Sequence, residues 1–459
     1  MLSFPFVLCA QTGKLSLSLP EAAEWMSRRN LTLQIADKAV DIARSERQKL
    51  NAFWYPAVNA SGMYVHLSDK VEVRQPLNTY TEPAKEFVQS FLPDNPLLVN
   101  ILDQLGSYTL SVPLLQRSLT TVDVSISWPI FTGGKRIYAS RIGNRMVDWS
   151  ELAKDETSAG LQTELVQTYY ALRLAEKVVE VREQTYRNLQ RHYAHARKLE
   201  VTGMISKAER LFAEVNQQEA LREWETARKE YDVAHEALCS LLDIQALNVY
   251  PMSPLFIIDE LPDSLYFKNL IPNTNYTIGK LRLEEVMADN RLRISRSTYL
   301  PTVALVGKQT LYAHHLPRNL MPRTMIGVGF TWNLFDGLNR ETDVRTARLV
   351  KESVALGREK AESALGVLVQ KLYTELQEAQ TEVSTLRATL SLSEELLRIR
   401  RKSFDEGMCT STEVVDAEVM LSQVRMAMLL AYYQFDVSLA TLCSICGVPE
   451  MFWDLMKKI

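Results

Sequence analysis

Trp332-Asn333-Leu334-Phe335-Asp336-Gly337 closes a strand-like alternation and opens a long helix-period stretch that runs to Gly447. The same plan occurs 204 positions earlier, where Trp128-Pro129-Ile130-Phe131-Thr132-Gly133 precedes a second such stretch. At the same spacing, Gly203-Met204 aligns with Gly407-Met408 without a gap. An internal repeat of this length indicates that the chain is built from two copies of one structural unit.

The composition excludes some classes of protein. The chain has 459 residues, a net charge of −3 and a pI near 6.2, which gives no reason to expect a basic surface for nucleic acid. No apolar run approaches the roughly 18–20 residues of a spanning helix. Any membrane contact is therefore expected from strands, a surface helix or a lipid.

The chain divides into five predicted segments. Residues 1–10 are apolar and end in a small residue before Gln11, which predicts the remnant of a signal peptide, with an ordinary N-terminal strand as the alternative. The first repeat is assigned to residues 11–247 and the second to 278–447. A proline-containing linker or equatorial segment at 248–277 separates them, and a C-terminal tail follows at 448–459.

Each repeat is predicted to contain an entry helix, two strands and two long helices. In the first repeat, a helical stretch over 20–52, in which Asn30 can cap the run 31–50, precedes strands at 57–67 and 108–128 and helices at 134–199 and 206–247. In the second, a helix over 276–296 precedes strands at 302–312 and 323–334 and helices at 337–404 and 410–446. Several prolines between 68 and 107 predict a long excursion without regular structure.

These assignments rest on the periodicity of the apolar residues. Val122, Val124, Ile126 and Trp128 alternate with polar residues, as in a half-buried strand. The second long helix has apolar residues that step by four and three in a heptad seam: Leu365, Val369, Leu372, Leu376, Ala379, Val383, Leu386 and Leu390. A helix of this length would extend about 100 Å at 1.5 Å per residue.

Four strands cannot close a barrel by themselves, since small barrels need about eight. An open sheet with an apolar face would also leave two unpaired edges. Two arrangements would solve this: the apolar face packs on helices of the same chain, or several chains pool their strands into one membrane barrel, and three chains would supply twelve.

The doubled pattern resembles the TolC-like outer-membrane efflux proteins. The resemblance rests on Tyr55-Pro56 and Leu300-Pro301 before strands, on the two strand-to-helix joins quoted above, and on Gly203 and Gly407 at the helix turns. It implies an α+β membrane protein in which each repeat supplies two β-strands and a long helical hairpin. It further implies a trimer with a twelve-stranded β-barrel in the outer membrane and an α-helical tunnel in the periplasm of a Gram-negative-type cell.

The same resemblance implies the partners. A homotrimer in outer-membrane lipid would be the passive exit duct of a tripartite efflux or type I secretion system, joined through a periplasmic adaptor (membrane fusion) protein to an inner-membrane transporter. It implies no enzyme activity and no catalytic residues, and we expect no cofactor, no metal and no nucleic-acid partner. The alternative from another class is a soluble coiled-coil scaffold, and a rival within the class is a metal-ion exporter.

The helix-hairpin turns are the predicted functional sites. The residues expected at the adaptor-contacting tips are Thr202, Gly203, Met204, Ser206, Gly407, Met408 and Thr410. Glu413 and Asp416 lie three residues apart on one helix, and the resemblance implies that three chains stack them into two carboxylate rings at a periplasmic constriction. A solvated helix face is the alternative. Opening would untwist the inner helices near Gly407, and Cys409 stands where the family often has a basic residue that holds the closed tip.

Weaker patterns favour structural roles. His192 and His195, and His314-His315, lack carboxylate or Cys partners at metal-ligand spacing, so surface or lumen histidines are favoured. The motif Cys443-Ser444-Ile445-Cys446 lies in a helical pattern, and Cys239 occupies the repeat position of Cys443. Buried packing therefore explains these cysteines better than redox or zinc chemistry.

Overall fold

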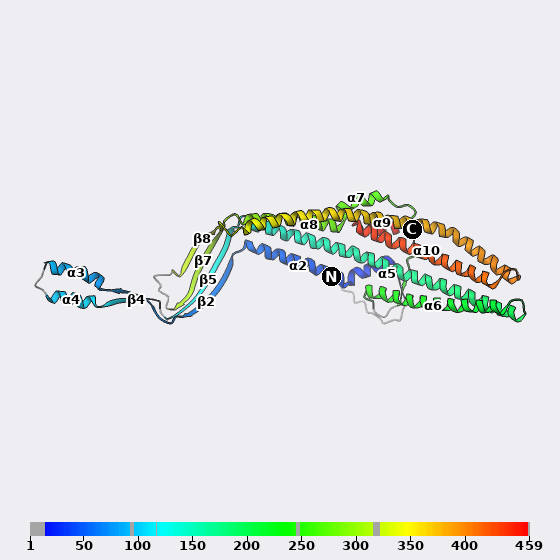
Figure 1. Cartoon of the computed structure of the whole chain (residues 1–459), viewed down its shortest axis with the longest axis horizontal. Coiled ribbons are helices and arrows are strands. Elements are labelled where there is room, and N and C mark those ends of the chain that lie inside the picture. Colours follow the sequence, from blue (N-terminus) through cyan, green and yellow to red (C-terminus); the bar gives the residue numbers. More distant parts are fainter. Residues whose placement is uncertain (1–13, 92–95, 116, 245–247, 315–321, 458–459) are drawn as a thin grey trace, which may run out of the picture. The chain divides into compact units, whose positions relative to one another are not determined.

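The computed structural model describes residues 14–91, 96–115, 117–244, 248–314 and 322–457 (Figure 1). These residues form two compact units, one within 1–47, 142–289 and 348–459 and the other within 48–141 and 290–347. The predicted signal remnant at 1–10 and His315 lie outside the described residues.

In the part of the chain that the structure describes, no helix combines the length and the apolar character that crossing a membrane requires.

A four-stranded antiparallel sheet is the centre of the second unit. Its strands are β2 (Ala57–His66), β5 (Ser118–Phe131), β7 (Thr302–His314) and β8 (Thr324–Thr331), in the order β2-β5-β7-β8 (Figure 1). Each repeat supplies one hairpin, because β2 pairs with β5 and β7 pairs with β8. The β5–β7 ladder joins the two hairpins, and β2 and β8 form the edges of this sheet.

The apolar face of this sheet is open to solvent in the single chain. Ile326, Val328 and Phe330 of β8 are 78%, 67% and 76% exposed. On β5, Ile126 and Trp128 are also exposed, whereas Asp123 is buried on the opposite face, where it accepts a hydrogen bond from Thr310 at 2.6 Å. One face of the sheet is therefore apolar and exposed to solvent, and polar side chains on the other face form hydrogen bonds with each other. A sheet that packs on its own helices has the opposite arrangement, because its apolar face is the buried one.

The two strand-to-helix joins owe their shape to glycine and tryptophan. Gly133 has φ +63°, and a Cβ there would lie 2.6 Å from the carbonyl oxygen of Ser297. The Nε1 of Trp128 donates to the carbonyl of Trp54 at 3.0 Å, and the Nε1 of Trp332 donates to that of Tyr299 at 3.1 Å. Each tryptophan thus fixes the end of one strand to the segment that leads into its partner strand.

The structure corrects the predicted strand at 108–128 and the irregular excursion at 68–107. The strand is two strands, β4 (Thr109–Leu115) and β5, and β4 pairs with β3 (Val71–Pro76) outside the four-stranded sheet. Between β3 and β4 lie the helices α3 (Asn78–Phe91) and α4 (Pro96–Gly106). The prolines misled the prediction because Pro76 ends a strand, Pro96 begins a helix, and Pro83 is tolerated inside α3.

The long helices form two hairpins. The first consists of α5 (Lys135–Val201) and α6 (Lys207–Leu241), and the second of α9 (Asn339–Asp405) and α10 (Ser411–Ile445). The helical stretch predicted over 20–52 is divided at Asn30, the predicted cap, into α1 (Leu19–Arg29) and α2 (Leu31–Asn51), because the backbone of Asn30 is extended (ψ 123°). A 3₁₀ turn, η1 (Ala52–Trp54), follows α2, and the second entry helix is α8 (Tyr276–Ser297).

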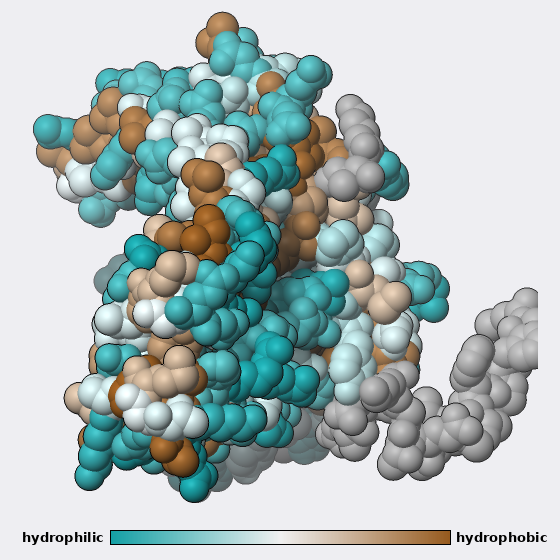
Figure 2. Space-filling model, turned by 90° about the vertical axis from the view of Figure 1, so that its right-hand side faces the viewer, coloured by the Kyte–Doolittle hydropathy of each residue, from teal (hydrophilic) through white to brown (hydrophobic). Residues whose placement is uncertain are grey.

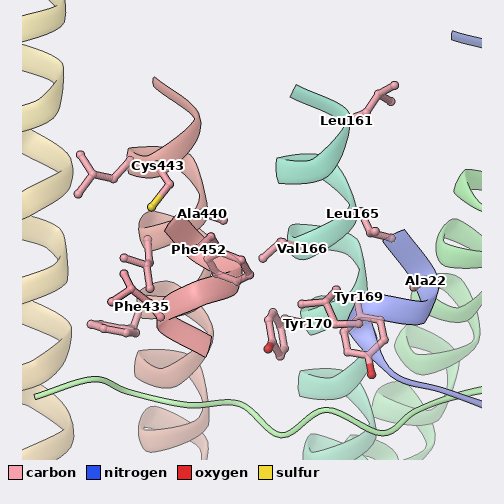
Figure 3. Close-up of a cluster of buried hydrophobic side chains, with 14 of the residues drawn as sticks. Ala22, Leu161, Leu165, Val166, Tyr169, Tyr170, Phe435, Ala440, Cys443 and Phe452 are labelled. Atoms are coloured by element: carbon pink, nitrogen blue, oxygen red, sulfur yellow. The ribbon is translucent and has the colours of Figure 1, made fainter. Parts of the chain in front are cut away.

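The main hydrophobic core joins the two hairpins at mid-length (Figure 3). Tyr169 and Tyr170 of α5 are fully buried. Phe256 connects Tyr170 to Phe435 of α10, since its ring centroid lies 6.1 Å from that of Tyr170 and 6.3 Å from that of Phe435. The hydroxyl of Tyr169 donates to the carbonyl of Leu17 at 2.8 Å, which satisfies a polar group that burial would otherwise penalise.

The segments predicted as linker and tail pack onto this core. The linker contains β6 (Asn248–Pro251), which pairs in parallel with β1 (Lys14–Leu17), and α7 (Ser264–Thr274). The segment predicted as a C-terminal tail contains helix α11 (Glu450–Met456), whose Phe452 and Leu455 bury their side chains in the core. The division into repeats at 11–247 and 278–447 stays an interpretation of the sequence.

The cysteines of this region are free thiols. Cys239, Cys443 and Cys446 are buried, and burial raises the pKa of Cys443 and of Cys446 to about 12. Among the described residues, no group of three or more His, Cys, Asp or Glu side chains could hold a metal ion.

Candidate functional site at the helix-hairpin turns

The two hairpin turns are built from the same backbone hydrogen bonds at equivalent repeat positions. After α5, the N–H of Met204 donates to the carbonyl of Leu199 at 2.9 Å, and Gly203 has φ +76°. After α9, the N–H of Met408 donates to the carbonyl of Ser403 at 2.8 Å, and Gly407 has φ +71°. This is the pattern of a helix that ends on a left-handed glycine.

Side-chain caps then begin the returning helices. Ser206 accepts a hydrogen bond from the N–H of Glu209 at 3.2 Å, and Thr410 forms a capping box with Glu413. Each turn leaves a methionine in solvent, since Met204 is 63% and Met408 69% exposed. Of the other predicted tip residues, Thr202, Gly203, Ser206, Gly407 and Thr410 are exposed too.

The surface around the turns is mixed in character. Figure 2 looks at the molecule from the side on which Figure 1 draws the helix-hairpin turns, and it shows separate hydrophobic patches on a largely hydrophilic face. Isolated apolar side chains of this kind suit a partner that reads a few anchor points.

Glu413 already has partners inside the chain. Its carboxylate accepts from the N–H and the hydroxyl of Thr410, at 3.4 and 3.3 Å, and forms an ion pair with Arg400 of α9. Arg400 also accepts a hydrogen bond at its carbonyl from the thiol of Cys409, at 3.2 Å. The basic residue at this tip therefore lies on α9, nine residues before Cys409, rather than in the turn.

Asp416 lies one turn further along α10 and is exposed. Unlike Glu413, its carboxylate forms no hydrogen bond or ion pair with another described residue. The structure thus places the two predicted gate residues on one helix but in different electrostatic settings: one carboxylate is neutralised by an arginine, and the other is left to solvent.

A contact between the two hairpins was missed by the sequence analysis. Glu418 of α10 is 3% exposed, yet its carboxylate binds both hairpins. Asn188 of α5 donates to one carboxylate oxygen at 2.6 Å, and Arg401 of α9 pairs with the other at 2.5 Å. We call these three residues the hairpin junction. A carboxylate at an otherwise apolar position of α10, between Val414, Val415, Ala417 and Leu421, is the sequence signal that could have found it.

Histidines reinforce the same contact nearer the turns. His192 of α5 is within hydrogen-bond distance of the buried hydroxyl of Ser411 on α10, at 2.8 Å, and its ring packs on Phe404 of α9. Burial, and secondly the neighbouring His195, lower the pKa of His192 to about 4. His195 lies 3.7 Å from a carboxylate oxygen of Asp405, also on α9. The two histidines therefore connect α5 to α9 and α10. The imidazole ring of His192 is neutral near pH 7.

Residues 114–243 and 273–448 match the family model of outer membrane efflux proteins. No curated protein matches the chain.

The chain is similar in fold to several solved outer-membrane proteins. The structure of CusC, described in terms of transmembrane channel formation, has 17% identity and a TM-score of 0.74, over 96% of this chain and 95% of that one. The outer membrane protein VceC of Vibrio cholerae has 14% identity and a TM-score of 0.75, over 94% and 96%. The open-state outer membrane channel MtrE of Neisseria gonorrhoeae has 16% identity and a TM-score of 0.71, over 94% of this chain and 89% of that one.

Proposed function

The chain belongs to the outer membrane efflux protein family, and from that premise we propose that it is the trimeric outer-membrane exit duct of a tripartite efflux or type I secretion system. Substrates would pass through it without chemical change. The energy would come from an inner-membrane transporter, and a periplasmic adaptor protein would connect the two.

The exposed apolar face of the four-stranded sheet carries this proposal. A sheet with Ile326, Val328 and Phe330 in solvent and with edges at β2 and β8 is unfavourable in water. Three copies that pair β8 of one chain with β2 of the next would satisfy both edges and turn the apolar face toward lipid. The polar face, with Asp123 and Thr310, would then line the interior.

The hairpin turns are the proposed adaptor contacts. They present the exposed Met204 and Met408 on glycine turns whose geometry is fixed by backbone hydrogen bonds. An adaptor that covers both methionines would bury flexible apolar side chains, which adapt well to a partner surface. We assign the same role to the neighbouring Thr202, Gly203, Ser206, Gly407 and Thr410.

Glu413 and Asp416 are the proposed constriction. In a trimer, three Asp416 carboxylates, which have no partner among the described residues of their own chain, would attract cations at a narrow passage. Glu413 would contribute less charge, because Arg400 of the same chain neutralises it. Opening the hairpins would have to break or move the Arg400–Glu413 pair and the hairpin junction, which together hold α10 to α5 and α9.

Two measurements test the proposal. The protein should fractionate with the outer membrane and, after detergent extraction, should produce ion conductance in a planar lipid bilayer without added nucleotide. A chain recovered in the soluble fraction that gives no conductance would favour the soluble coiled-coil scaffold instead.

A further inference from the structure

The β3–β4 hairpin extends the edge of the four-stranded sheet and carries a helical hairpin that the proposed duct does not explain. The β2–β5 ladder ends at His66 and Ser118, and the N–H of Leu67 then donates to the carbonyl of Arg117 at 2.7 Å. The β3–β4 ladder begins directly after this, at Val71 and Leu115. Two nearly continuous ladders therefore connect the edge strand β2 to α3 and α4 (Figure 1).

Helices α3 and α4 pack on each other in antiparallel fashion. Gly106 at the end of α4 approaches Asn78 and Thr81 at the start of α3, and Lys85 of α3 pairs with Asp103 of α4 at 2.6 Å. The half-buried positions that face the partner helix are Thr81, Lys85 and Val88 in α3 and Val99, Leu102 and Gly106 in α4.

A second stripe on each helix is apolar and exposed. On α3 it contains Tyr80, Phe87 and Phe91, and on α4 it contains Leu98, Ile101 and Leu105. At about 100° per residue, each stripe lies roughly a quarter turn from the side that faces the partner helix. Because the helices are antiparallel, the two quarter turns have opposite sense in space and bring both stripes to one side. We call these six residues the apolar face of the hairpin.

The spacing of the apolar face indicates a helical partner. Tyr80, Ala84, Phe87 and Phe91 step by four, three and four, and Leu98, Ile101 and Leu105 step by three and four. This is the a/d spacing of helices that pack side by side. Phe87 is 63% and Phe91 71% exposed, so the seam is unoccupied in the single chain.

The charges of the opposite side disfavour a lipid surface as the occupant. Helices that lie on membranes usually carry Lys and Arg on the polar face, which attract anionic lipids. Here the polar side carries Glu82, Glu86 and Gln89, and Lys85 is already paired with Asp103. An acidic hairpin would be repelled by an anionic leaflet, whereas its apolar face would still pack on another helix.

We propose that the apolar faces of the α3–α4 hairpins from three copies of this chain pack together into a six-helix cap at the end of the sheet that carries β3 and β4. This inference rests on the proposed trimer, because the hairpin extends from β2, the edge strand that would pair with the next copy. Three-fold symmetry would place the same face of each copy around one axis. The cap would bury the aromatic and leucine side chains that one chain leaves in solvent.

Cysteine cross-linking in intact cells tests the cap. Phe87→Cys and Ile101→Cys place a thiol on the apolar face, and Gln89→Cys and Gln104→Cys are matched controls on the polar side. All four are made with Cys9→Ser and Cys409→Ser, while the buried Cys239, Cys443 and Cys446 are retained. Treatment with a short bis-maleimide should shift the two apolar-face variants from monomer to covalent dimer in denaturing gels, and should leave the two controls as monomer.

The assembly state is measured separately, as the mass of the detergent-extracted, uncross-linked protein. A trimer whose apolar-face thiols give no covalent dimer would overturn the cap and leave the duct proposal standing. Equal cross-linking of apolar and polar positions would overturn it too, as would labelling of the apolar-face thiols only by a membrane-restricted reagent. A protein that is monomeric in detergent would instead contradict the proposed trimer.

Discussion

Replacing Glu418 by glutamine should loosen the contact between the two helical hairpins much more than the equivalent change in the other repeat. Glutamine keeps an oxygen that can accept from Asn188, but it loses the charge that pairs with Arg401. Hydrogen bonds to charged groups contribute about 1.5–3 kcal/mol. Arg401 is partly exposed and can be rehydrated, so we expect the lower half of that range.

The matched control is Glu214→Gln, 204 residues earlier in the repeat. Glu214 is more exposed than Glu418, and its partner Arg210 keeps a second carboxylate, Glu200, at 2.8 Å. A pair of this kind contributes about 1 kcal/mol or less.

Amide hydrogen exchange in the first turns of α10 measures the difference. Since each 1.4 kcal/mol is a factor of ten, Glu418→Gln should speed exchange about 10- to 40-fold, and Glu214→Gln should speed it by about 5-fold or less in the matching turns of α6. Equal effects of the two substitutions, or no change in α10, would refute the assignment of Glu418 as the bond between the hairpins.

Three further outcomes follow from the turns and the junction. Gly407→Ala should destabilise the α9–α10 turn by about 1–2 kcal/mol because φ is +71°, and Gly407→Asn should cost less, as measured by exchange at the turn. Burial lowers the pKa of His192 from 6.5 to about 4, so the unfolded state binds more protons than the folded state below about pH 6.5. The free energy of unfolding should therefore fall by about 1–2 kcal/mol between pH 7 and pH 5. In thermal unfolding, His192→Gln should remove most of that fall. Glu413→Ala combined with Asp416→Ala should reduce cation selectivity and block by multivalent cations in bilayer recordings, with the greater share from Asp416, and unchanged selectivity would remove the ring of carboxylates.

The repeated parts of the fold were the parts that local signals could predict. The helix over 134–199 and its counterpart over 337–404 are observed at Lys135–Val201 and Asn339–Asp405. A heptad seam and a left-handed glycine depend on residues that are close in sequence. Both can therefore be predicted from the sequence alone. The cap predicted at Asn30 is of the same local kind, since its side chain accepts a hydrogen bond from the N–H of Thr32 at 2.8 Å.

The remaining differences depend on contacts that are distant in sequence. Phe452 makes α11 a part of the core only because α5 and α10 provide the surface on which it packs. Glu413 was predicted to belong to a ring of carboxylates, and its ion pair with Arg400, 13 residues away across the turn, was not predicted. Glu418 and Asn188 are 230 residues apart, and no local pattern brings them together.

The number of chains in the detergent-extracted protein decides whether strands are shared between copies. A four-stranded sheet with β2 and β8 as its edges and an exposed apolar face requires partners, and three copies would supply twelve strands. Native mass spectrometry from detergent should therefore give three times the chain mass of 52.3 kDa, less any cleaved signal. A single chain that stays monomeric after mild extraction would contradict the account.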